Sequence, residues 1–290
     1  MTVETLEPAA AYLRTWTSAK ALWFTRADGS RLRYIVTGDG PPLLLLHTVR
    51  TQLDYFQRVI PTLAERHRVY ALDFPGMGWS DIRPGATYSH DDLQNAVVEF
   101  VRHLDLTDLT LVGESMGASL ALTASVELSD RVTRVVASNT YDYPHGVERA
   151  NPLARVIVSS VRAPLIGPTF AALENRPILK GIMSGGYADP SRLPAPFLDE
   201  LSRVGKRPGY SRVARGIYRN LPSLIAARER YSAITVPVTL LYTSDDWSRD
   251  ADRRRTTAAI PTASVHTIAD AGHFCAMEKP TEFAGAVLGA

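Results

Sequence analysis

Strand-like and helix-like segments alternate along the first 140 residues, and this alternation limits the chain to few folds. Residues 20–26 and 31–37 flank an Asp28-Gly29 turn, a pattern that predicts a β-hairpin. Further strands are expected at Pro42 to His47, Arg68 to Asp73, Leu109 to Gly113 and Arg131 to Ser138, with helices at Gln52 to Glu65, Ser89 to Leu104 and Met116 to Leu128 between them. Strands that alternate with helices in this order predict a mostly parallel sheet covered on both faces.

The alternation stops at residue 141 and resumes near residue 233. Residues 141–232 contain no convincing strand, and prolines break their helical stretches into short pieces. After them, strands are expected at Val238 to Tyr242 and Ser264 to Ile268, and helices at Arg249 to Ile260 and Thr281 to Leu288. The sequence therefore predicts a core of residues 1–140 and 233–290 with a helical insertion at 141–232. This insertion is basic, because it carries 14 Lys and Arg against 7 Asp and Glu.

Composition and charge argue against several classes of protein. The 32 basic and 30 acidic residues leave a net charge of +2, which gives no electrostatic basis for binding nucleic acid. The longest apolar run is far shorter than the roughly 20 residues of a membrane span, and the first twenty residues do not resemble a secretory signal. We therefore expect a cytoplasmic protein. The single cysteine, Cys275, excludes an intramolecular disulfide, and we interpret it as a buried structural residue rather than a catalytic thiol.

The segment Gly113-Glu114-Ser115-Met116-Gly117 matches the pattern G-x-S-x-G between an expected strand and an expected helix. The chain must turn sharply there, and side chains at the two glycine positions would collide with neighbouring backbone. Such a turn exposes Ser115 above the carboxyl ends of the strands. The Met116 amide, at the start of the helix, then faces the position where negative charge develops during attack on a carbonyl. The segment predicts that Ser115 is a nucleophile.

A serine nucleophile needs a histidine base and a carboxylate, which in this arrangement follow in the order serine, acid, histidine. His273 lies just after the last expected strand, whereas the other histidines precede the acid, lie on helices or fall inside a strand pattern. The acid is expected after the preceding strand, where Asp245 and Asp246 are adjacent. Asp142, which follows an earlier strand, is an alternative acid, although a turn or helix-cap role also fits it.

These residues resemble the cap-bearing α/β-hydrolases of the esterase, lipase and carbon–carbon-bond hydrolase type. The likeness is carried by GESMG, by AGHF around His273 and by DFPGMGWSD at residues 73–81. It also includes LYTSDDW, in which Thr243 replaces the family's usual glycine and Asp246 occupies the position of the acid. The resemblance implies an eight-stranded, mostly parallel sheet with helices on both faces. It also implies that the insertion at 141–232 is a helical cap.

The loop after residue 46 departs from the family pattern, since His47-Thr48 stands where the family usually has His-Gly. The resemblance implies that the amide of Val49 is the second oxyanion donor, beside that of Met116, and the hydroxyl of Thr48 could add a donor. Arg50 has two interpretations, a bidentate contact with a substrate carboxylate or a structural ion pair with a loop aspartate. Glu114, beside the nucleophile, is a further candidate substrate contact.

The expected activity is that of a serine hydrolase, acting on a small-molecule ester or related carbonyl compound through an acyl-enzyme intermediate. The same fold also hosts carbon–carbon-bond hydrolases, acyltransferases and lyases, so these remain alternatives, as does a non-enzymatic receptor or scaffold. No cofactor or metal is expected, and the sequence sets no oligomeric state. The insertion is expected to be mobile and to select substrates. Its basic residues from Arg203 to Arg230 would favour a carboxylate-bearing substrate, or else form a solvated face.

Overall fold

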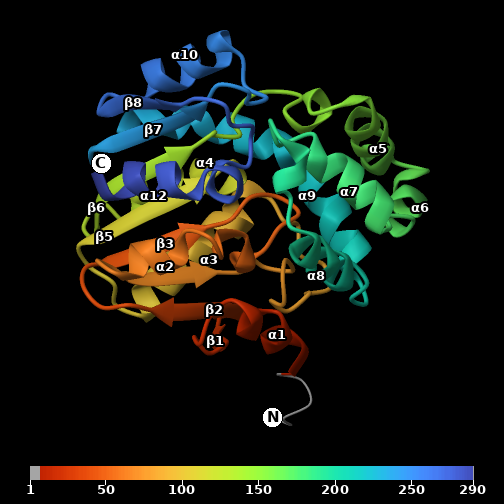
Figure 1. Cartoon of the computed structure of the whole chain (residues 1–290), viewed down its shortest axis with the longest axis horizontal. Coiled ribbons are helices and arrows are strands. Elements are labelled where there is room, and N and C mark those ends of the chain that lie inside the picture. Colours follow the sequence, from red (N-terminus) through yellow and green to blue (C-terminus); the bar gives the residue numbers. More distant parts are fainter. Residues whose placement is uncertain (1–6, 290) are drawn as a thin grey trace.

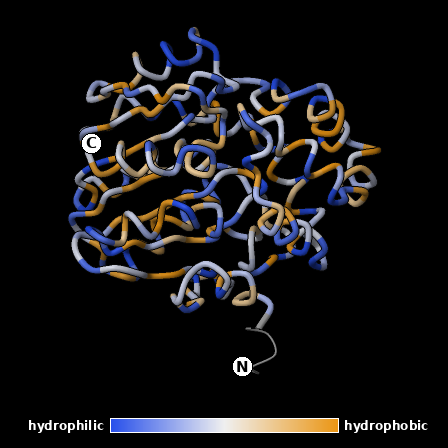
Figure 2. The backbone as a smooth tube through the Cα atoms, viewed as in Figure 1, coloured by the Kyte–Doolittle hydropathy of each residue, from blue (hydrophilic) through white to orange (hydrophobic). Residues whose placement is uncertain are grey.

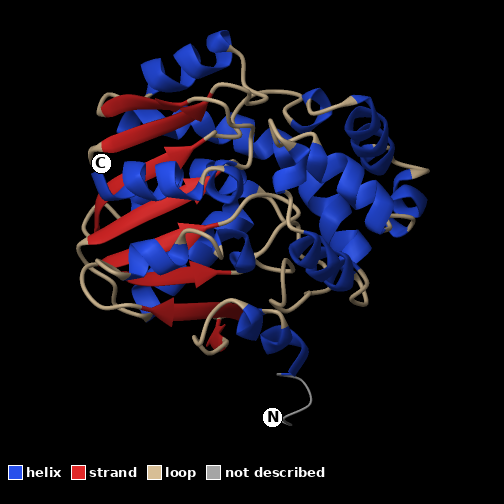
Figure 3. Cartoon of the chain, viewed as in Figure 1, coloured by secondary structure: helices blue, strands red, loops and turns tan. Residues whose placement is uncertain are grey.

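A computed structural model describes residues 7–289, so residues 1–6 and 290 of the expected core lie outside the described part. Its eight strands form a single sheet in the order β1-β2-β4-β3-β5-β6-β7-β8 (Figures 1 and 3). The strands are β1 (Leu22–Thr25), β2 (Arg31–Thr37), β3 (Pro42–Leu46), β4 (Arg68–Leu72), β5 (Leu109–Glu114), β6 (Val132–Ser138), β7 (Val238–Thr243) and β8 (Ala263–Ile268).

The direction of the strands places their ends where the site needs them. Strand β1 pairs antiparallel with β2, which pairs antiparallel with β4, and all the remaining pairs are parallel. Every residue of β5 is buried, as a strand covered on both faces requires, and Figure 2 shows hydrophobic residues along the central strands. Because β3 to β8 run in one direction, the loops after them gather at one edge of the sheet. The expected mostly parallel, eight-stranded sheet is confirmed.

Helices cover both faces of this sheet (Figure 1). Two of them, α2 and α12, contact each other, and so do α3 and α4. Ser89 caps α3, because its hydroxyl accepts a hydrogen bond from the amide of Asp92. The helices outside the insertion are α1 (Glu7–Ala11), α2 (Ile60–Ala64), α3 (His90–His103), α4 (Met116–Glu127), α10 (Asp250–Ala259), α11 (Cys275–Glu278) and α12 (Pro280–Gly289).

The prediction of a single helix from Gln52 to Glu65 is wrong. A 3-10 turn, η3 (Leu53–Phe56), is followed by the short α2, which has a proline in its first turn. The apolar spacing predicted a continuous helix, but Pro61 lacks the amide hydrogen that a helix interior needs and favours a helix start. The amide of Leu53 also leaves the helical pattern, since it donates to Asp73 Oδ1 at 2.7 Å.

All the regular secondary structure of the segment 141–232 is helical, and the segment contains no strand. Its helices lie at the edge of the sheet toward which the arrows of the parallel strands point (Figure 3). They are α5 (Pro152–Arg162), α6 (Gly167–Ala172), α7 (Arg176–Ser184), α8 (Ala195–Gly205) and α9 (Tyr210–Ala226), with the 3-10 turns η4 (Val147–Arg149), η5 (Pro190–Arg192) and η6 (Ala227–Ala233). The expected boundary at residue 232 falls inside η6, which contacts α4 and α10 and so adjoins the core.

No helix among residues 7–289 combines the length and the apolar character needed to cross a membrane.

Candidate active site

Ser115 occupies a sharp turn between β5 and α4, as the sequence predicts. Its φ of 57° and ψ of −117° are strained for a residue with a side chain. A Cβ atom on Gly113 would lie 2.2 Å from the carbonyl oxygen of Gly117, and one on Gly117 would lie 2.0 Å from that of Leu46. Both glycines are therefore required by close backbone contacts, which hold the turn against the end of β3.

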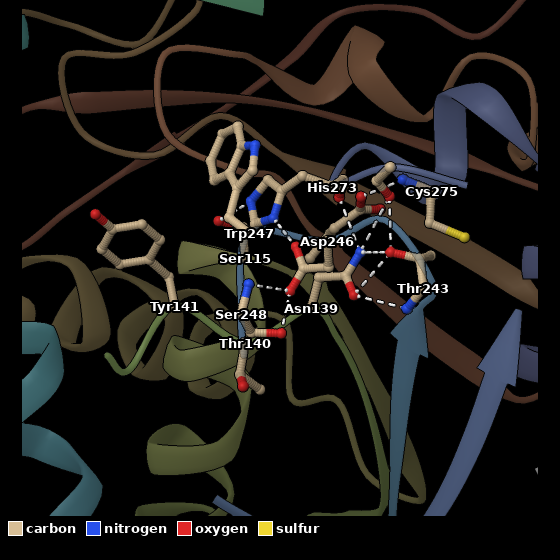
Figure 4. Close-up of polar contacts among 12 residues, drawn as sticks. Ser115, Asn139, Thr140, Tyr141, Thr243, Asp246, Trp247, Ser248, His273 and Cys275 are labelled. Atoms are coloured by element: carbon tan, nitrogen blue, oxygen red, sulfur yellow. Dashed lines mark hydrogen bonds and ion pairs between the residues drawn. The ribbon is translucent and has the colours of Figure 1, made fainter. Parts of the chain in front are cut away.

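Ser115, His273 and Asp246 form one hydrogen-bonded chain (Figure 4). The imidazole Nε2 lies 2.8 Å from Ser115 Oγ, and Nδ1 lies 2.5 Å from Asp246 Oδ1. The amide of Ser248 donates to the other oxygen of Asp246 at 2.9 Å. Burial alone would raise the pKa of the Asp246 carboxyl, but His273 and the hydrogen bonds from Ser248 lower it below its ordinary value. Asp246 is therefore held as a carboxylate facing the base.

The two other candidate acids lie elsewhere. The Asp245 side chain is exposed and accepts a hydrogen bond from the hydroxyl of its neighbour Ser244. Asp142 is buried, but its carboxyl accepts a hydrogen bond from Thr256 Oγ1 at 2.7 Å rather than from the imidazole. Burial raises the pKa of Asp142 to about 6. Of the three aspartates, the structure brings only Asp246 to His273.

The ring of Trp247 stacks on the imidazole of His273, a contact that the sequence did not predict. The ring centroids are 3.7 Å apart and the planes differ by 11° (Figure 4). The indole Nε1 donates to the carbonyl oxygen of Gly185 at 2.9 Å, which fixes the plane of the stack. Trp247 follows the acid directly in the chain, and that position was the only signal available.

Buried polar groups from the ends of β6 and β7 hold the loop that carries His273. The side-chain amide of Asn139 donates to the carbonyl oxygen of His273 at 3.0 Å, and the Thr243 hydroxyl donates to that of Gly272 at 2.8 Å. The amide of Thr243 in turn donates to Asn139 Oδ1 at 3.1 Å. Thr243, which departs from the family's glycine, therefore contributes its hydroxyl to fixing the histidine loop.

Glu114, which directly precedes Ser115 in the chain, anchors the loop that carries His273. Its carboxylate accepts hydrogen bonds from the amides of Cys275 and Ala276, at 2.6 and 3.1 Å, and from the hydroxyl of Tyr55 at 2.8 Å. Burial raises the pKa of Glu114 to about 8, even though these hydrogen bonds act to lower it. Both carboxyl oxygens accept hydrogen bonds from protein donors, which makes Glu114 an anchor of this loop, and its contact with a substrate stays a prediction.

A second buried carboxylate, Glu278, joins the histidine loop to the insertion. It accepts from the amide of Gly272 at 2.7 Å and from the amides of Ala188 and Asp189 at 3.1 and 2.7 Å. The amide of Phe274 also donates to the carbonyl oxygen of Gly186 at 3.0 Å. Residues 185–189 of the insertion are therefore fixed directly against the loop that carries the base.

The loop after β3 lies against the turn that carries Ser115. The position of a Cβ on Gly117 is also 2.7 Å from the carbonyl oxygen of His47. His47 is fully buried, its Nε2 accepts from the amide of Phe74 at 3.1 Å, and burial lowers its pKa to about 4, so it is a neutral structural residue. Met116 begins α4, so its amide has no acceptor within the helix. The hydroxyl of Thr48 is buried and makes no hydrogen bond with the described residues.

Arg50 is engaged by the insertion, not by the expected loop aspartate. Its guanidinium pairs with both oxygens of Glu174, donates to Tyr210 Oη at 3.1 Å and lies 4.7 Å from the centre of the Tyr210 ring. Arg50 is 4% exposed and has a φ of 62°, in the left-handed region. The ion-pair interpretation is therefore the one that the structure supports, although the partner lies in the insertion.

The whole arrangement is closed to solvent. The side chains of Ser115, His273 and Asp246 are all 0% exposed. Cys275 is also buried, and burial raises its thiol pKa well above the usual value, which disfavours a reactive thiolate. No group of three or more His, Cys, Asp or Glu side chains within residues 7–289 is placed to hold a metal ion. The structure thus brings Ser115, His273 and Asp246 together in the order that the sequence predicts for a nucleophile, a base and an acid.

Comparison with known proteins agrees with this fold. Haloalkane dehalogenase 2 from Mycobacterium tuberculosis is 27% identical over 276 residues, which cover 92% of this chain and 93% of that protein. The crystal structure of Cfl2 from Burkholderia cenocepacia has a TM-score of 0.83 at 22% identity, covering 94% of this chain and 96% of that one. The epoxide hydrolase CorEH has a TM-score of 0.82 at 21% identity, covering 94% and 98%. Residues 43–286 match the Alpha/beta hydrolase family, and the chain belongs to that family.

Proposed function

We propose that this protein is a serine hydrolase that cleaves a small-molecule ester or related carbonyl compound through an acyl-enzyme intermediate. The observation that carries the proposal is the continuous hydrogen-bonded chain from Ser115 Oγ through His273 to the Asp246 carboxylate. Trp247 stacked on the imidazole and Asn139 bonded to its backbone hold the base in the orientation that proton transfer needs.

In the proposed mechanism, His273 takes the proton from Ser115 as the serine oxygen attacks the substrate carbonyl. The amides of Met116 and Val49 donate to the resulting oxyanion, and Asp246 stabilises the imidazolium. When the tetrahedral intermediate collapses, His273 gives its proton to the leaving group and the acyl group stays on Ser115. His273 then deprotonates a water molecule, which attacks the acyl-enzyme and releases the acid.

The identity of the nucleophile separates this chemistry from the activity named for the relative Haloalkane dehalogenase 2. Displacement of a halide from a saturated carbon by a carboxylate gives an ester, which water can hydrolyse at its carbonyl carbon. The same displacement by Ser115 would give an ether, which has no carbonyl for water to attack. Turnover therefore requires that Ser115 attack a carbonyl carbon, which supports acyl chemistry over dehalogenation.

We also propose that residues 141–232 form a mobile cap. The nucleophile and the base have no exposed surface, so a substrate reaches them only if part of the protein moves. The insertion lies at the edge of the sheet where the site is built and is tied to it by Arg50 and Glu278 (Figure 1). Such a cap would exclude water during the reaction and supply the pocket that selects the acyl or leaving group.

A fluorophosphonate probe tests the nucleophile directly. The wild-type protein should be labelled at Ser115 with one probe per chain, and Ser115→Ala should not be labelled. The same variant should lower turnover of p-nitrophenyl esters by about 10⁶-fold, as when a triad nucleophile is removed elsewhere. Ser244→Ala is a matched control, since Ser244 is exposed and lies outside the chain of hydrogen bonds.

A substrate panel then defines the reaction class. Esters of increasing acyl length, thioesters, a vinylogous diketone and a 1-haloalkane should be compared at equal concentration. The proposal expects turnover of at least one acyl substrate and none of the haloalkane. Labelling of Ser115→Ala at the wild-type rate, or halide release that survives this substitution, would show that the serine mechanism is wrong.

A further inference from the structure

The outer end of the insertion exposes an unusual group of apolar side chains. Seven large hydrophobic residues are markedly exposed within residues 7–289, and five of them lie between residues 153 and 173. We call these five the apolar tip: Leu153, Val156, Leu165, Ile166 and Leu173, which are 41%, 59%, 90%, 51% and 59% exposed. They come from α5, the turn after it and the end of α6, which contact each other and lie farthest from the sheet (Figures 1 and 2).

A groove lined by arginines adjoins the apolar tip. Its volume is about 440 Å³, and it lies between Pro168 of α6, Arg212, Arg215 and Arg219 of α9 and the loop at residues 86–87. No aspartate or glutamate lines it. Pro168 follows Ile166 by two residues, so the groove begins where the exposed turn ends. A basic groove beside exposed apolar side chains is suited to a ligand that is anionic at one end and apolar at the other.

Arg215 connects the two features. Its guanidinium donates to the carbonyl oxygens of Ala163 and Pro164, at 3.2 and 3.3 Å, directly before Leu165. Its Nε is buried and makes no hydrogen bond with the described residues, so the guanidinium is held at this position by its Nη2 contacts. The same side chain therefore holds the exposed turn in place and forms part of the groove wall.

The surrounding charge favours an anionic surface over a second copy of the chain. Between Ala150 and Tyr187 the only acidic residue is Glu174, which is paired with Arg50, whereas Arg155, Arg176 and Lys180 are exposed. Two copies that met through the apolar tip would bring these basic groups together, and like charges at close range oppose association. The negative surface of an anionic lipid bilayer attracts basic groups and accepts apolar side chains below its headgroups.

We propose that the apolar tip and the arginine groove form a docking surface for anionic lipid membranes. Leu165 and Ile166 insert below the headgroups, while Arg212, Arg215 and Arg219 contact lipid phosphates. The insertion thereby attaches the protein to a membrane surface on which apolar substrates collect. This inference does not depend on the proposed catalytic mechanism, because binding is measured without turnover.

Vesicle sedimentation with the full-length protein tests the proposal. The wild type should bind vesicles that contain phosphatidylglycerol and bind pure phosphatidylcholine vesicles at least tenfold more weakly, with binding that falls as salt rises. The double variant Leu165→Ser/Ile166→Ser should weaken binding by at least about tenfold. Arg212→Gln/Arg219→Gln should weaken it by about fivefold for each charge removed and reduce its salt dependence.

Matched variants outside the insertion control for general surface effects. Val265→Ser removes an exposed apolar side chain on β8, and Arg254→Gln/Arg255→Gln removes two exposed charges on α10; neither should change vesicle binding. Circular dichroism and urea unfolding of every variant show that it is folded. Equal binding to both kinds of vesicle, or binding unchanged by Leu165→Ser/Ile166→Ser, would overturn the proposal. So would a wild-type dimer in sedimentation equilibrium that this double variant converts to a monomer, since the apolar tip would then join two copies.

Discussion

The site has a core side, formed by the sheet and the histidine loop, and an insertion side, formed by the insertion at 141–232. The two sides are held in different ways. On the core side, the histidine loop is fixed by buried groups that bond its backbone, with Asn139, Thr243 and Glu114 as the principal partners. On the insertion side, one main contact is the charged pair of Arg50 and Glu174, in which Glu174 keeps 16% of its side-chain surface exposed. Water can replace the partners of such a pair when the two parts separate, whereas it reaches the buried amides of the histidine loop only if the loop unfolds.

Under the proposed mechanism, this difference gives the two requirements of catalysis to different parts of the molecule. The base must keep one orientation through the reaction, and the buried anchors on the core side provide that. The closed site must also admit a substrate, and the exchangeable pair on the insertion side allows movement without disturbing the base. Glu278 and the amide of Phe274 are exceptions, because they join the histidine loop directly to residues 186–189 of the insertion. We therefore expect the segment at 185–189 to stay fixed while the helices beyond it move.

Disabling the core side should have the largest effect. Asp246→Asn should lower kcat by about 10⁴-fold with the fold intact, because an amide favours the wrong tautomer of His273 and cannot balance the imidazolium. Steady-state kinetics with an activated ester, alongside circular dichroism, would measure both properties. Asp245→Asn should stay within about twofold of wild type, since this side chain is exposed. If the two severities are reversed, Asp246 is not the acid of the triad.

Glu278→Gln tests the residue shared by both sides. A glutamine can accept hydrogen bonds at one oxygen only, so at least one of the amides of Gly272, Ala188 and Asp189 would lose its acceptor. We expect the free energy of unfolding to fall by about 2–3 kcal/mol, since each buried unsatisfied group costs about 1–3 kcal/mol. Urea unfolding measures the change. Glu282→Gln on the exposed surface of α12 is the control, and an equal loss in both variants would contradict the anchoring role.

Much of the core side was predictable because its signals are local. Gly113, Ser115 and Gly117 fall within five residues, and steric limits on a sharp turn specify them together. His273 and Asp246 followed from the order of serine, acid and histidine and from the expected strand ends. The alternation of strands and helices likewise predicted the sheet, although Pro61 broke one expected helix in a way that apolar spacing did not reveal.

The partners across the site could not be predicted from the sequence, and the reason is physical. Asn139 lies 134 residues from the carbonyl that it holds, and Arg50 lies 124 residues from Glu174. Hydrogen-bonding side chains of this kind carry no periodic pattern, so their partners emerge only when the chain is folded. Glu114 shows the same limit, since its place beside the nucleophile suggested a substrate contact while its actual donors come from residues 55, 275 and 276.

Breaking the ion pair of Arg50 and Glu174 on the insertion side should have a smaller effect on activity than Asp246→Asn, and it should also change the mobility of the insertion. Arg50→Ala and Glu174→Ala should each lower kcat/KM by about tenfold, and the double variant should lose little more, because residues of one ion pair are coupled. Hydrogen exchange should show faster exchange in α8 and α9 in all three variants, with β5 and the histidine loop unchanged. Arg176→Ala, which breaks an exposed pair with Asp199 in the same insertion, should have little effect. Additive losses, or faster exchange in β5, would contradict the division between the two sides.

The smallest effect is expected at the junction between core and insertion, where Asp142 is buried but bonds Thr256 rather than the base. Burial raises its pKa from 3.8 to about 6, so the folded protein holds this proton more tightly than the unfolded chain does. The contribution of this group to the free energy of unfolding of the wild type therefore falls as pH rises from about 4 to about 6 and levels off above that. An asparagine has nearly the same shape and never ionises, so Asp142→Asn should be more stable than wild type at pH 7.5 by on the order of 1 kcal/mol. The advantage should shrink toward pH 4, where the carboxyl of the folded wild type is almost fully protonated. Urea unfolding at the two pH values measures this difference, and kcat for the variant should stay near the wild-type value. A large loss of kcat would instead make Asp142 a partner of His273, and the core side of the site would then extend into the insertion.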